Sequence, residues 1–271
     1  MHRPSVVLSR LAACLALALS PLAVDAATCS NTSAGFEAWK AEFARTAQRA
    51  GVQQAGLNAL AQARYASSTI AADRNQKSFR YSLQKFMEVR GSATIVAQGK
   101  KRKARNAEFF AALERTYGVP AGVLIAIHGM ETAFGSYMGD SQVVSAIVTL
   151  TFDCRRSDFF APHAIGALKL VDLGSVTTAT LGAKHGELGH TQFLPGNALT
   201  YGQDWNRDGR VDFYDLGDAM ASTAHYLRQK GWQPGRGYQE GEVNFKVLKE
   251  WNAATVYQQS LAIMGRQIDS P

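Results

Sequence analysis

The sequence predicts a mainly α-helical protein, and three observations carry that prediction. Apolar residues recur at helical spacing along most of the chain, beginning with Phe36, Trp39, Phe43 and Ala47. Strand-like alternation of apolar and polar residues is scarce. The chain has 271 residues, of which 46% are hydrophobic, so it can bury a sizeable core and is not a disordered protein.

The first half of the chain is expected to consist of helices separated by short breaks. The first helix should cover residues 36–50, and Gly51 is its expected stop. Segments 53–65, 76–90 and 92–117 continue the same helical pattern.

The second half begins with "GVP" at 118–120, which ends one helix and puts Pro120 at the first turn of the next, over 120–134. Further helices are expected at 142–150 and 216–230. The region 174–214 is glycine-rich and less regular. Because no internal repeat or low-complexity linker interrupts these segments, we expect one compact unit with helical lobes.

Residues 1–26 are typical of a cleaved secretory signal. Arg3 and Arg10 form a basic start, a short apolar run follows, and a small-residue cleavage site ends at Ala26. The tetrapeptide "LAAC", which ends at Cys14, also matches the motif that marks a lipid-modified cysteine, which would tether the protein to a membrane. Arg10 interrupts the apolar run just before it and apolar residues continue well past it, which favours an ordinary signal. We therefore expect an exported, periplasmic protein.

Two cysteines, Cys29 and Cys154, remain after the signal is removed. In an oxidising compartment they are candidates for a disulfide, but the sequence leaves open whether they meet. Neither cysteine has the spacing of a zinc ligand or local signs of a nucleophile.

The mature chain is basic. Removing residues 1–26 takes Arg3, Arg10 and Asp25 from the 29 basic and 22 acidic residues, which leaves 27 and 21 and a net charge of +6. This charge suits anionic partners, such as a wall polymer or lipid head groups, although it also serves solubility. The densest basic run, "KKRKAR" at 100–105, is typical of a solvated helix face, and no nucleic-acid-binding module is recognised.

Glu131 is the candidate catalytic residue, because it is the one carboxylate in the apolar helix expected at 120–134. Leu124, Ile127 and Phe134 are spaced to share its face of the helix. Partial burial there would raise its carboxyl pKa, as a general acid requires near neutral pH. A carboxylate that merely reaches backbone amides or an arginine is the alternative. Gln192, in the polar "GELGHTQFLP" at 186–195, would add a sugar-binding wall.

The stretch "DWNRDGRVDFYDLGD" at 204–218 follows the pattern of a calcium-binding loop of the EF-hand type. Asp204, Asn206, Asp208 and Asp212 stand at positions 1, 3, 5 and 9, and the carbonyl of Arg210 at position 7. Position 12 is Asp215 rather than glutamate, so either affinity is reduced or the last ligand comes from elsewhere. The alternative is an acidic turn that caps the helix starting near 216. A bound Ca²⁺ would be structural, with no cofactor needed for catalysis.

These elements, in this order, resemble the lytic murein transglycosylase B family. The resemblance runs over nearly the whole mature chain, through "FEAWKAEF", "YGVPAGVLIAIHGMETAFGSYMG", "RRSDFF", "GHTQFLP", "DWNRDGRVDFYD", "YLRQKGW" and "WNAATVY". It implies a lysozyme-like, mainly helical core that binds peptidoglycan. It also implies cleavage of the β-1,4 bond between N-acetylmuramic acid and N-acetylglucosamine without water, which leaves a 1,6-anhydromuramoyl end. Glu131 would be the sole catalytic carboxylate, acting first as acid and then as base.

Carried over position by position, the resemblance implies further site residues. Gln192 matches a residue that contacts the sugar near the acid, and the glycan cleft would be lined by Arg156, Tyr226, Asn252 and Tyr257. The implied ion ligands are Asp204, Asn206, Asp208, the Arg210 carbonyl and Asp218.

Two departures from the family pattern keep other functions open. Ala183 stands where a hydroxyl is common, and Glu187 stands where a small residue is common. If Glu187 lay opposite Glu131, a hydrolytic muramidase with two acids would be the alternative. A non-catalytic wall-binding or calcium-stabilised scaffold protein is the third candidate, which the intact "GMET" disfavours.

The predicted organisation has three parts: the signal at 1–26, an N-terminal helical region at 27–117 that packs on the core, and a lysozyme-like core at 118–271 that contains the ion loop and a C-terminal helix. The expected partners are glycan strands of peptidoglycan, with other cell-wall enzymes as candidates, no nucleic acid, and a monomeric state.

Overall fold

The computed structural model describes residues 28–75 and 81–270, so the predicted signal and Cys14 lie outside the described residues. The described chain is mainly α-helical, which confirms the predicted fold class. Its helices are α1 Phe36–Arg49, α2 Gln54–Gln62, α3 Ser67–Arg74, α4 Leu83–Val89, α5 Ser92–Arg105, α6 Ala107–Tyr117, α7 Ala121–Thr132, α8 Val143–Phe152, α9 Ser157–Asp172, α10 Pro195–Tyr201, α11 Leu216–Gln229, α12 Leu248–Trp251 and α13 Thr255–Asp269. Two short strands, β1 Ser141–Gln142 and β2 Leu181–Gly182, pair antiparallel, and a 3₁₀ turn covers Phe245–Val247.

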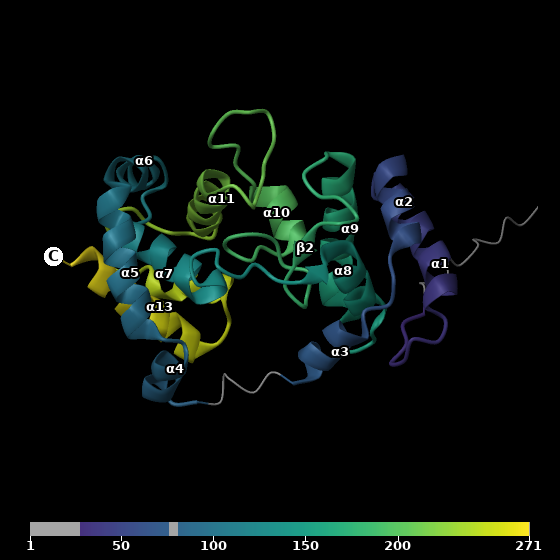
Figure 1. Cartoon of the computed structure of the whole chain (residues 1–271), viewed down its shortest axis with the longest axis horizontal. Helices are drawn as coiled ribbons and strands as arrows, with labels where there is room; N and C mark the ends of the chain where they lie inside the picture. Colours follow the sequence, from purple (N-terminus) through teal and green to yellow (C-terminus); the bar gives the residue numbers. More distant parts are fainter. Residues whose placement is uncertain (1–27, 76–80, 271) are drawn as a thin grey trace, which may run out of the picture.

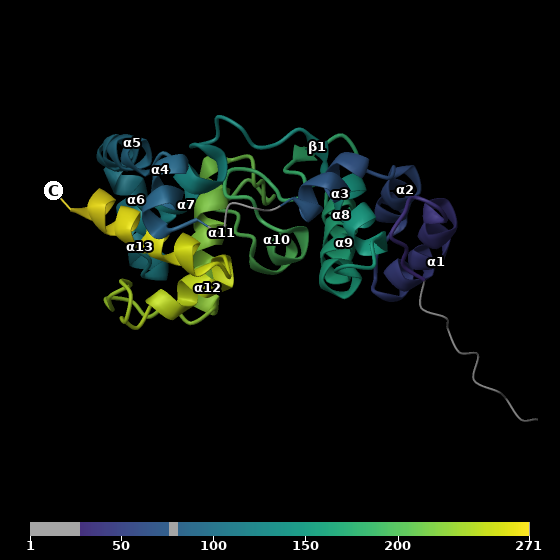
Figure 2. The same cartoon turned by 90° about the horizontal axis from the view of Figure 1, so that it is seen from below.

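The helices form two groups at opposite ends of an elongated molecule (Figure 1). On one side α2 packs on α8 and α9, α3 packs on α8, and α1 packs on α2. On the other side α4, α5 and α6 gather around α7, α11 and α13. Helix α10 and the irregular region lie between the two groups, as both views show (Figure 2). The helices described within the region predicted at 27–117 therefore divide between the two groups, because α1–α3 lie in one and α4–α6 in the other.

Helix α7 is the centre of the second group and is buried along almost its whole length. Pro120 precedes it in an extended conformation, and Ala133 ends it in a left-handed one. Helix α13 packs closely against it, because Gly122 has no side chain: a Cβ there would lie 2.1 Å from the carbonyl oxygen of Gly265. The apolar sequence of this helix thus reflects contacts on every side rather than on a single face.

Several predicted helices differ from the observed ones. The segment 92–117 is two helices, because the chain turns at Asn106 between α5 and α6. Phe134 lies beyond the end of α7 with a positive φ of 63°, so it does not continue the helical face that carries Glu131. Helix α9 was not predicted, and it contains Pro162, a residue that disfavours helix interiors.

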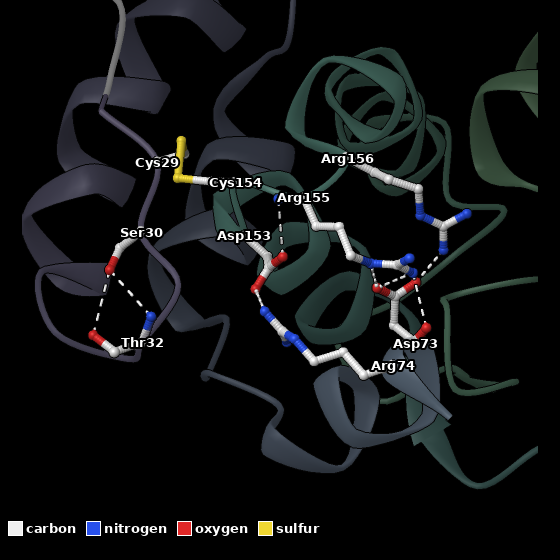
Figure 3. A network of polar contacts seen from close by, with 9 residues as sticks. All are labelled: Cys29, Ser30, Thr32, Asp73, Arg74, Asp153, Cys154, Arg155 and Arg156. Carbon is white, nitrogen blue, oxygen red and sulfur yellow. Dashed lines mark hydrogen bonds and ion pairs between the residues drawn. A yellow bond between two sulfur atoms is a disulfide. The ribbon is translucent and has the colours of Figure 1, made fainter. Parts of the chain in front are cut away.

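A disulfide ties the N-terminal segment to the turn between α8 and α9, and an ion-pair cluster ties the end of α3 to the same turn (Figure 3). Cys29 and Cys154 are joined, with their Cα atoms 4.9 Å apart. Asp73, only 3% exposed, accepts hydrogen bonds from Arg155 and Arg156 on the same turn. Although burial acts in the opposite direction, these two arginines hold the pKa of Asp73 below its ordinary value.

Among the described residues no single helix is both long and apolar enough to cross a membrane. The pair α6 and α7 reaches that length and composition only when taken together across a bend of 109°.

Candidate active site

A cavity of about 290 Å³ opens beside the last turn of α7. Glu131 lines it from α7, and Gln192 and Glu187 line it from the irregular region between β2 and α10. Tyr226 of α11 and Asn252, which follows α12, also line the cavity. Four of the six residues predicted to act on or contact glycan therefore meet around one space.

The Glu131 carboxylate is held by two donors on one of its oxygens. The indole Nε1 of Trp251 donates to Oε1 at 3.1 Å, and the Tyr257 hydroxyl donates to the same atom. Both donors come from the C-terminal part of the chain, at least 120 residues away in sequence. Neither donor uses the other oxygen, Oε2, and Glu131 itself lines the cavity.

Burial raises the pKa of the Glu131 carboxyl. The hydrogen bonds from Tyr257 and Trp251 and the charge of Arg90 oppose this rise, whereas the nearby carboxylate of Glu187 adds to it. The direction agrees with the prediction made from the apolar helix. A carboxyl with a raised pKa keeps its proton closer to neutral pH and can act as a general acid.

Tyr257 lies behind Glu131 rather than in the cavity wall. Its side chain is 1% exposed and it packs against Phe86, so its hydroxyl can reach Glu131 but not a sugar in the cavity. Burial raises its own pKa, so it stays a neutral donor. Tyr257 was predicted to line the glycan cleft, whereas the structure places it on Glu131 and not among the residues that line this cavity.

Trp251 and Arg90 are site residues that the sequence analysis missed. Trp251 lies directly before Asn252 and lines the cavity. A buried indole N–H needs an acceptor, which is the only signal in the sequence that could have pointed to it. Arg90 donates to the carbonyl of Met130 at 3.2 Å, beside Glu131.

The cavity-lining polar groups are oriented by backbone contacts. Gln192 has a positive φ of 56°, and its amide donates to the carbonyls of Gly189 at 2.7 Å and Met138 at 3.4 Å. The Tyr226 hydroxyl donates to the Glu250 carbonyl at 2.6 Å. The Asn252 side-chain oxygen accepts from the Ala254 amide at 3.0 Å. These contacts fix the groups before any ligand binds.

Arg156 is not in the wall of this cavity. Its guanidinium binds Asp73 and lies 4.8 Å from the ring centre of Phe160, and it lines a separate depression near Cys154. The structure therefore gives Arg156 a partner inside the protein, which the sequence could not reveal because Asp73 is 83 residues away.

Glu187 is a second carboxylate in the same cavity as Glu131. The His185 backbone amide donates to its Oε2 at 3.1 Å, and the His185 ring lies 3.4 Å from its Oε1. The other ring nitrogen of His185 is 3.7 Å from Asp73. Glu187 is thus fixed through His185 to the buried cluster at the turn between α8 and α9.

The acidic loop at 204–218 folds through its own side chains. Gly209 N–H donates to Asp204 at 2.9 Å, Asp208 N–H to Asn206 at 2.9 Å, and Arg210 N–H to Asp208 at 2.9 Å. These carboxylate and amide oxygens are of the kind that Ca²⁺ prefers. Within residues 28–75 and 81–270, however, no three or more His, Cys, Asp or Glu side chains converge on one point as metal ligands would.

The two aspartates considered for the end of the loop have structural partners. Asp218 is fully buried, and its oxygens accept the backbone N–H groups of Trp205 at 2.8 Å and Asp212 at 2.9 Å. Asp215 caps α11 by accepting from the Asp218 amide at 3.0 Å. The capping alternative is thus observed for Asp215, and the ion-binding role of the loop stays a prediction.

Comparison with known proteins gives a family and a fold. The family described as "Transglycosylase SLT domain" matches residues 35–243. Membrane-bound lytic murein transglycosylase B of Escherichia coli (strain K12) is 32% identical over 123 residues, which cover 45% of this chain and 34% of that protein. The match thus spans about a third of the length of that relative.

Two solved structures are similar over most of the chain. SltB3 from Pseudomonas aeruginosa in complex with NAG-NAM-pentapeptide has a TM-score of 0.79 at 25% identity, covering 87% of this chain and 80% of its own. The Escherichia coli lytic transglycosylase Slt35 in complex with calcium has a TM-score of 0.73 at 19% identity, covering 92% of this chain and 98% of its own. The arrangement of helices is therefore shared with lytic transglycosylases.

Proposed function

Since the chain belongs to the lytic murein transglycosylase B family, we propose that it cleaves peptidoglycan glycan strands without water. The bond cut is the β-1,4 bond between N-acetylmuramic acid and N-acetylglucosamine, and the product carries a 1,6-anhydromuramoyl end. The observation that carries this proposal is Glu131, a desolvated carboxyl that lines a cavity and is held by two donors on one oxygen.

The geometry of Glu131 suits both steps of the reaction. Because Tyr257 and Trp251 donate to Oε1, the protonated acid carries its proton on Oε2, which can donate it to the leaving glycosidic oxygen. The ionised carboxylate then accepts the proton of the muramoyl C6 hydroxyl as that oxygen attacks C1. The attacking group is already part of the sugar, so no second carboxylate or activated water is required.

The other cavity residues support binding rather than proton transfer. Gln192, Tyr226 and Asn252 present fixed polar groups, and Trp251 presents an aromatic face to the same space. Such a mixture of oriented polar groups and an aromatic surface is typical of a ligand site. We assign Tyr257 to holding Glu131 and assign no direct sugar contact to Arg156, whose guanidinium binds Asp73.

The proposal also includes a location in the cell envelope and a structural ion. Peptidoglycan as substrate agrees with export by a signal at 1–26 to the periplasm, where the protein would act as a monomer, with other cell-wall enzymes as candidate partners. The loop at 204–218 would hold Ca²⁺ through Asp204, Asn206, Asp208, the Arg210 carbonyl and Asp218, and it would stabilise the fold without entering the reaction. The calcium complex of Slt35 supports this assignment.

A hydrolytic muramidase is the second candidate, because Glu187 lines the same cavity as Glu131. The two functions give different products from the same strands. Mass spectrometry of purified peptidoglycan digested by the mature protein should show anhydromuramoyl ends, which vanish with Glu131→Gln. Reducing ends, one water heavier, would instead indicate hydrolysis that uses Glu187. The absence of any product would favour a non-catalytic wall-binding protein.

A further inference from the structure

A second, larger cavity of about 590 Å³ lies between α5 and the segment 129–136. Arg90 and Arg102 line it together with the polar side chains of Thr94, Gln98 and Ser136. No carboxylate is among its lining residues. The cavity therefore presents two positive charges and several hydrogen-bonding groups to whatever enters it.

Both guanidiniums are positioned by neutral groups. Arg90 donates to the carbonyl of Met130 at 3.2 Å, and Arg102 lies 4.0 Å from the ring centre of Phe134 and donates to Gln98 at 3.1 Å. In the described part of the chain neither has a carboxylate within ion-pair distance. By contrast, Arg155 and Arg156 both bind Asp73. Two arginines that share a cavity and have no carboxylate at ion-pair distance are suited to an external anion.

The backbone around the cavity reinforces this preference. Helix α5 begins at the cavity wall after Gly91, which provides no side-chain cap, so the positive end of the helix dipole adds to the two arginines. On the opposite wall Ala133 and Phe134 both have positive φ, 47° and 63°. Such strained residues cluster at sites that bind ligands, and here they place the Phe134 ring beneath Arg102.

The segment that follows α7 separates this cavity from the catalytic one. Its residues 133–136 line the arginine cavity, whereas the Met138 carbonyl accepts from Gln192, which lines the cavity of Glu131. The stretch 133–138 thus joins the wall of the arginine cavity to a residue of the catalytic cavity, so a chain attached to a sugar beside Glu131 has the arginine cavity as a neighbouring site. In peptidoglycan the group attached to the muramoyl sugar is a peptide that bears carboxylates.

We propose that the cavity between α5 and residues 129–136 is a carboxylate-binding subsite for the peptide attached to the glycan, with Arg90 and Arg102 as its ligands. The proposal rests on the proposed function and specifies its substrate as glycan that carries peptide. A planar guanidinium binds a carboxylate through two parallel hydrogen bonds, so the subsite favours peptides whose carboxyl groups are free.

The test compares three substrates of equal glycan length: strands with intact peptides, strands stripped of peptide, and strands whose peptide carboxyls are amidated. We expect kcat/KM to be about tenfold higher on the intact strands than on the other two. A difference of about this size corresponds to the loss of one charge-assisted hydrogen bond. Arg102→Gln should abolish this preference without lowering the rate on stripped strands. Arg105→Gln is the matched control, because Arg105 is an exposed arginine on the same helix outside the cavity.

Equal rates of the wild-type protein on intact and amidated strands would overturn the proposal, as would an Arg102→Gln variant that behaves like Arg105→Gln. The preference should also shrink as salt is raised, because the contact is electrostatic. Failure of the underlying function looks different: no anhydromuramoyl product would form from any of the three substrates.

Discussion

Tyr257→Phe tests how the protein controls its acid. The change removes one of the two donors to Glu131 Oε1 and leaves the Trp251 donor and the buried ring in place. A hydrogen bond to a charged group contributes about 1.5–3 kcal/mol. If about half of the carboxylate charge has developed when the glycosidic bond breaks, the variant loses about 0.75–1.5 kcal/mol in the transition state, or roughly fourfold to twelvefold in kcat.

The same substitution predicts a change in pH dependence. The Tyr257 hydrogen bond lowers the pKa of Glu131, so its removal lets burial raise that pKa further. In the proposed mechanism activity requires protonated Glu131 and falls as pH rises through its pKa, so the falling limb of the kcat profile should move to higher pH. The assay is anhydromuramoyl product formation at saturating substrate across the pH range.

Tyr238→Phe is the matched control, because that hydroxyl is also bound to a carboxylate, Asp269 at 3.2 Å, and is not one of the donors to Glu131. It should leave the position of the limb unchanged. A limb that moves to lower pH in Tyr257→Phe, or moves equally in both variants, would refute the assignment of Tyr257 as the donor that holds the catalytic acid.

Three further predictions concern stability. The pKa of Glu131 is raised above its ordinary 4.5, so its protonation stabilises the fold below pH 4.5, and this stabilisation is lost as pH rises through the folded-state pKa. Glu131→Gln should therefore raise Tm by a few degrees at pH 7 and leave Tm unchanged at pH 4. An equal change of Tm at both pH values would contradict this prediction. Reducing Cys29–Cys154, which closes a loop with a sequence separation of 125, should cost about 5 kcal/mol in denaturant unfolding, whereas an unchanged midpoint would show that the bridge does not constrain the unfolded chain. Ca²⁺ at about 100 times its Kd should stabilise by about 2.7 kcal/mol, and Asp204→Ala should remove the effect; identical melting with and without Ca²⁺ would argue against the ion loop.

Local patterns in the sequence predicted the helical class and the apolar helix that carries Glu131. Leu124 and Ile127 are fully buried, as their spacing with Glu131 predicted, and Glu131 lines a cavity at the end of the same helix. This works because helical periodicity is a local property that the sequence displays directly. Phe134 is the exception, since the left-handed turn that ends α7 is not visible in the spacing of apolar residues.

Contacts between distant segments could not be predicted in this way. Trp251 and Tyr257 reach Glu131 across 120 and 126 residues, and nothing in their local sequence specifies that partner. The same holds for Asp73, which binds Arg156 and thereby removes it from the predicted cavity wall. The motif at 186–195 predicted Gln192 near the acid, because glycines and polar groups in an irregular segment are typical of a binding wall. The contact of Glu187 with His185, in contrast, is visible only in the folded structure.

The most direct test of the central claim is digestion of peptidoglycan in water enriched in ¹⁸O, with the products weighed by mass spectrometry. If Glu131 serves as both acid and base and the C6 hydroxyl is the nucleophile, the new muramoyl ends contain no ¹⁸O and are one water lighter than reducing ends. Incorporation of one ¹⁸O at each new end would contradict the account, because it would show that water is the attacking group.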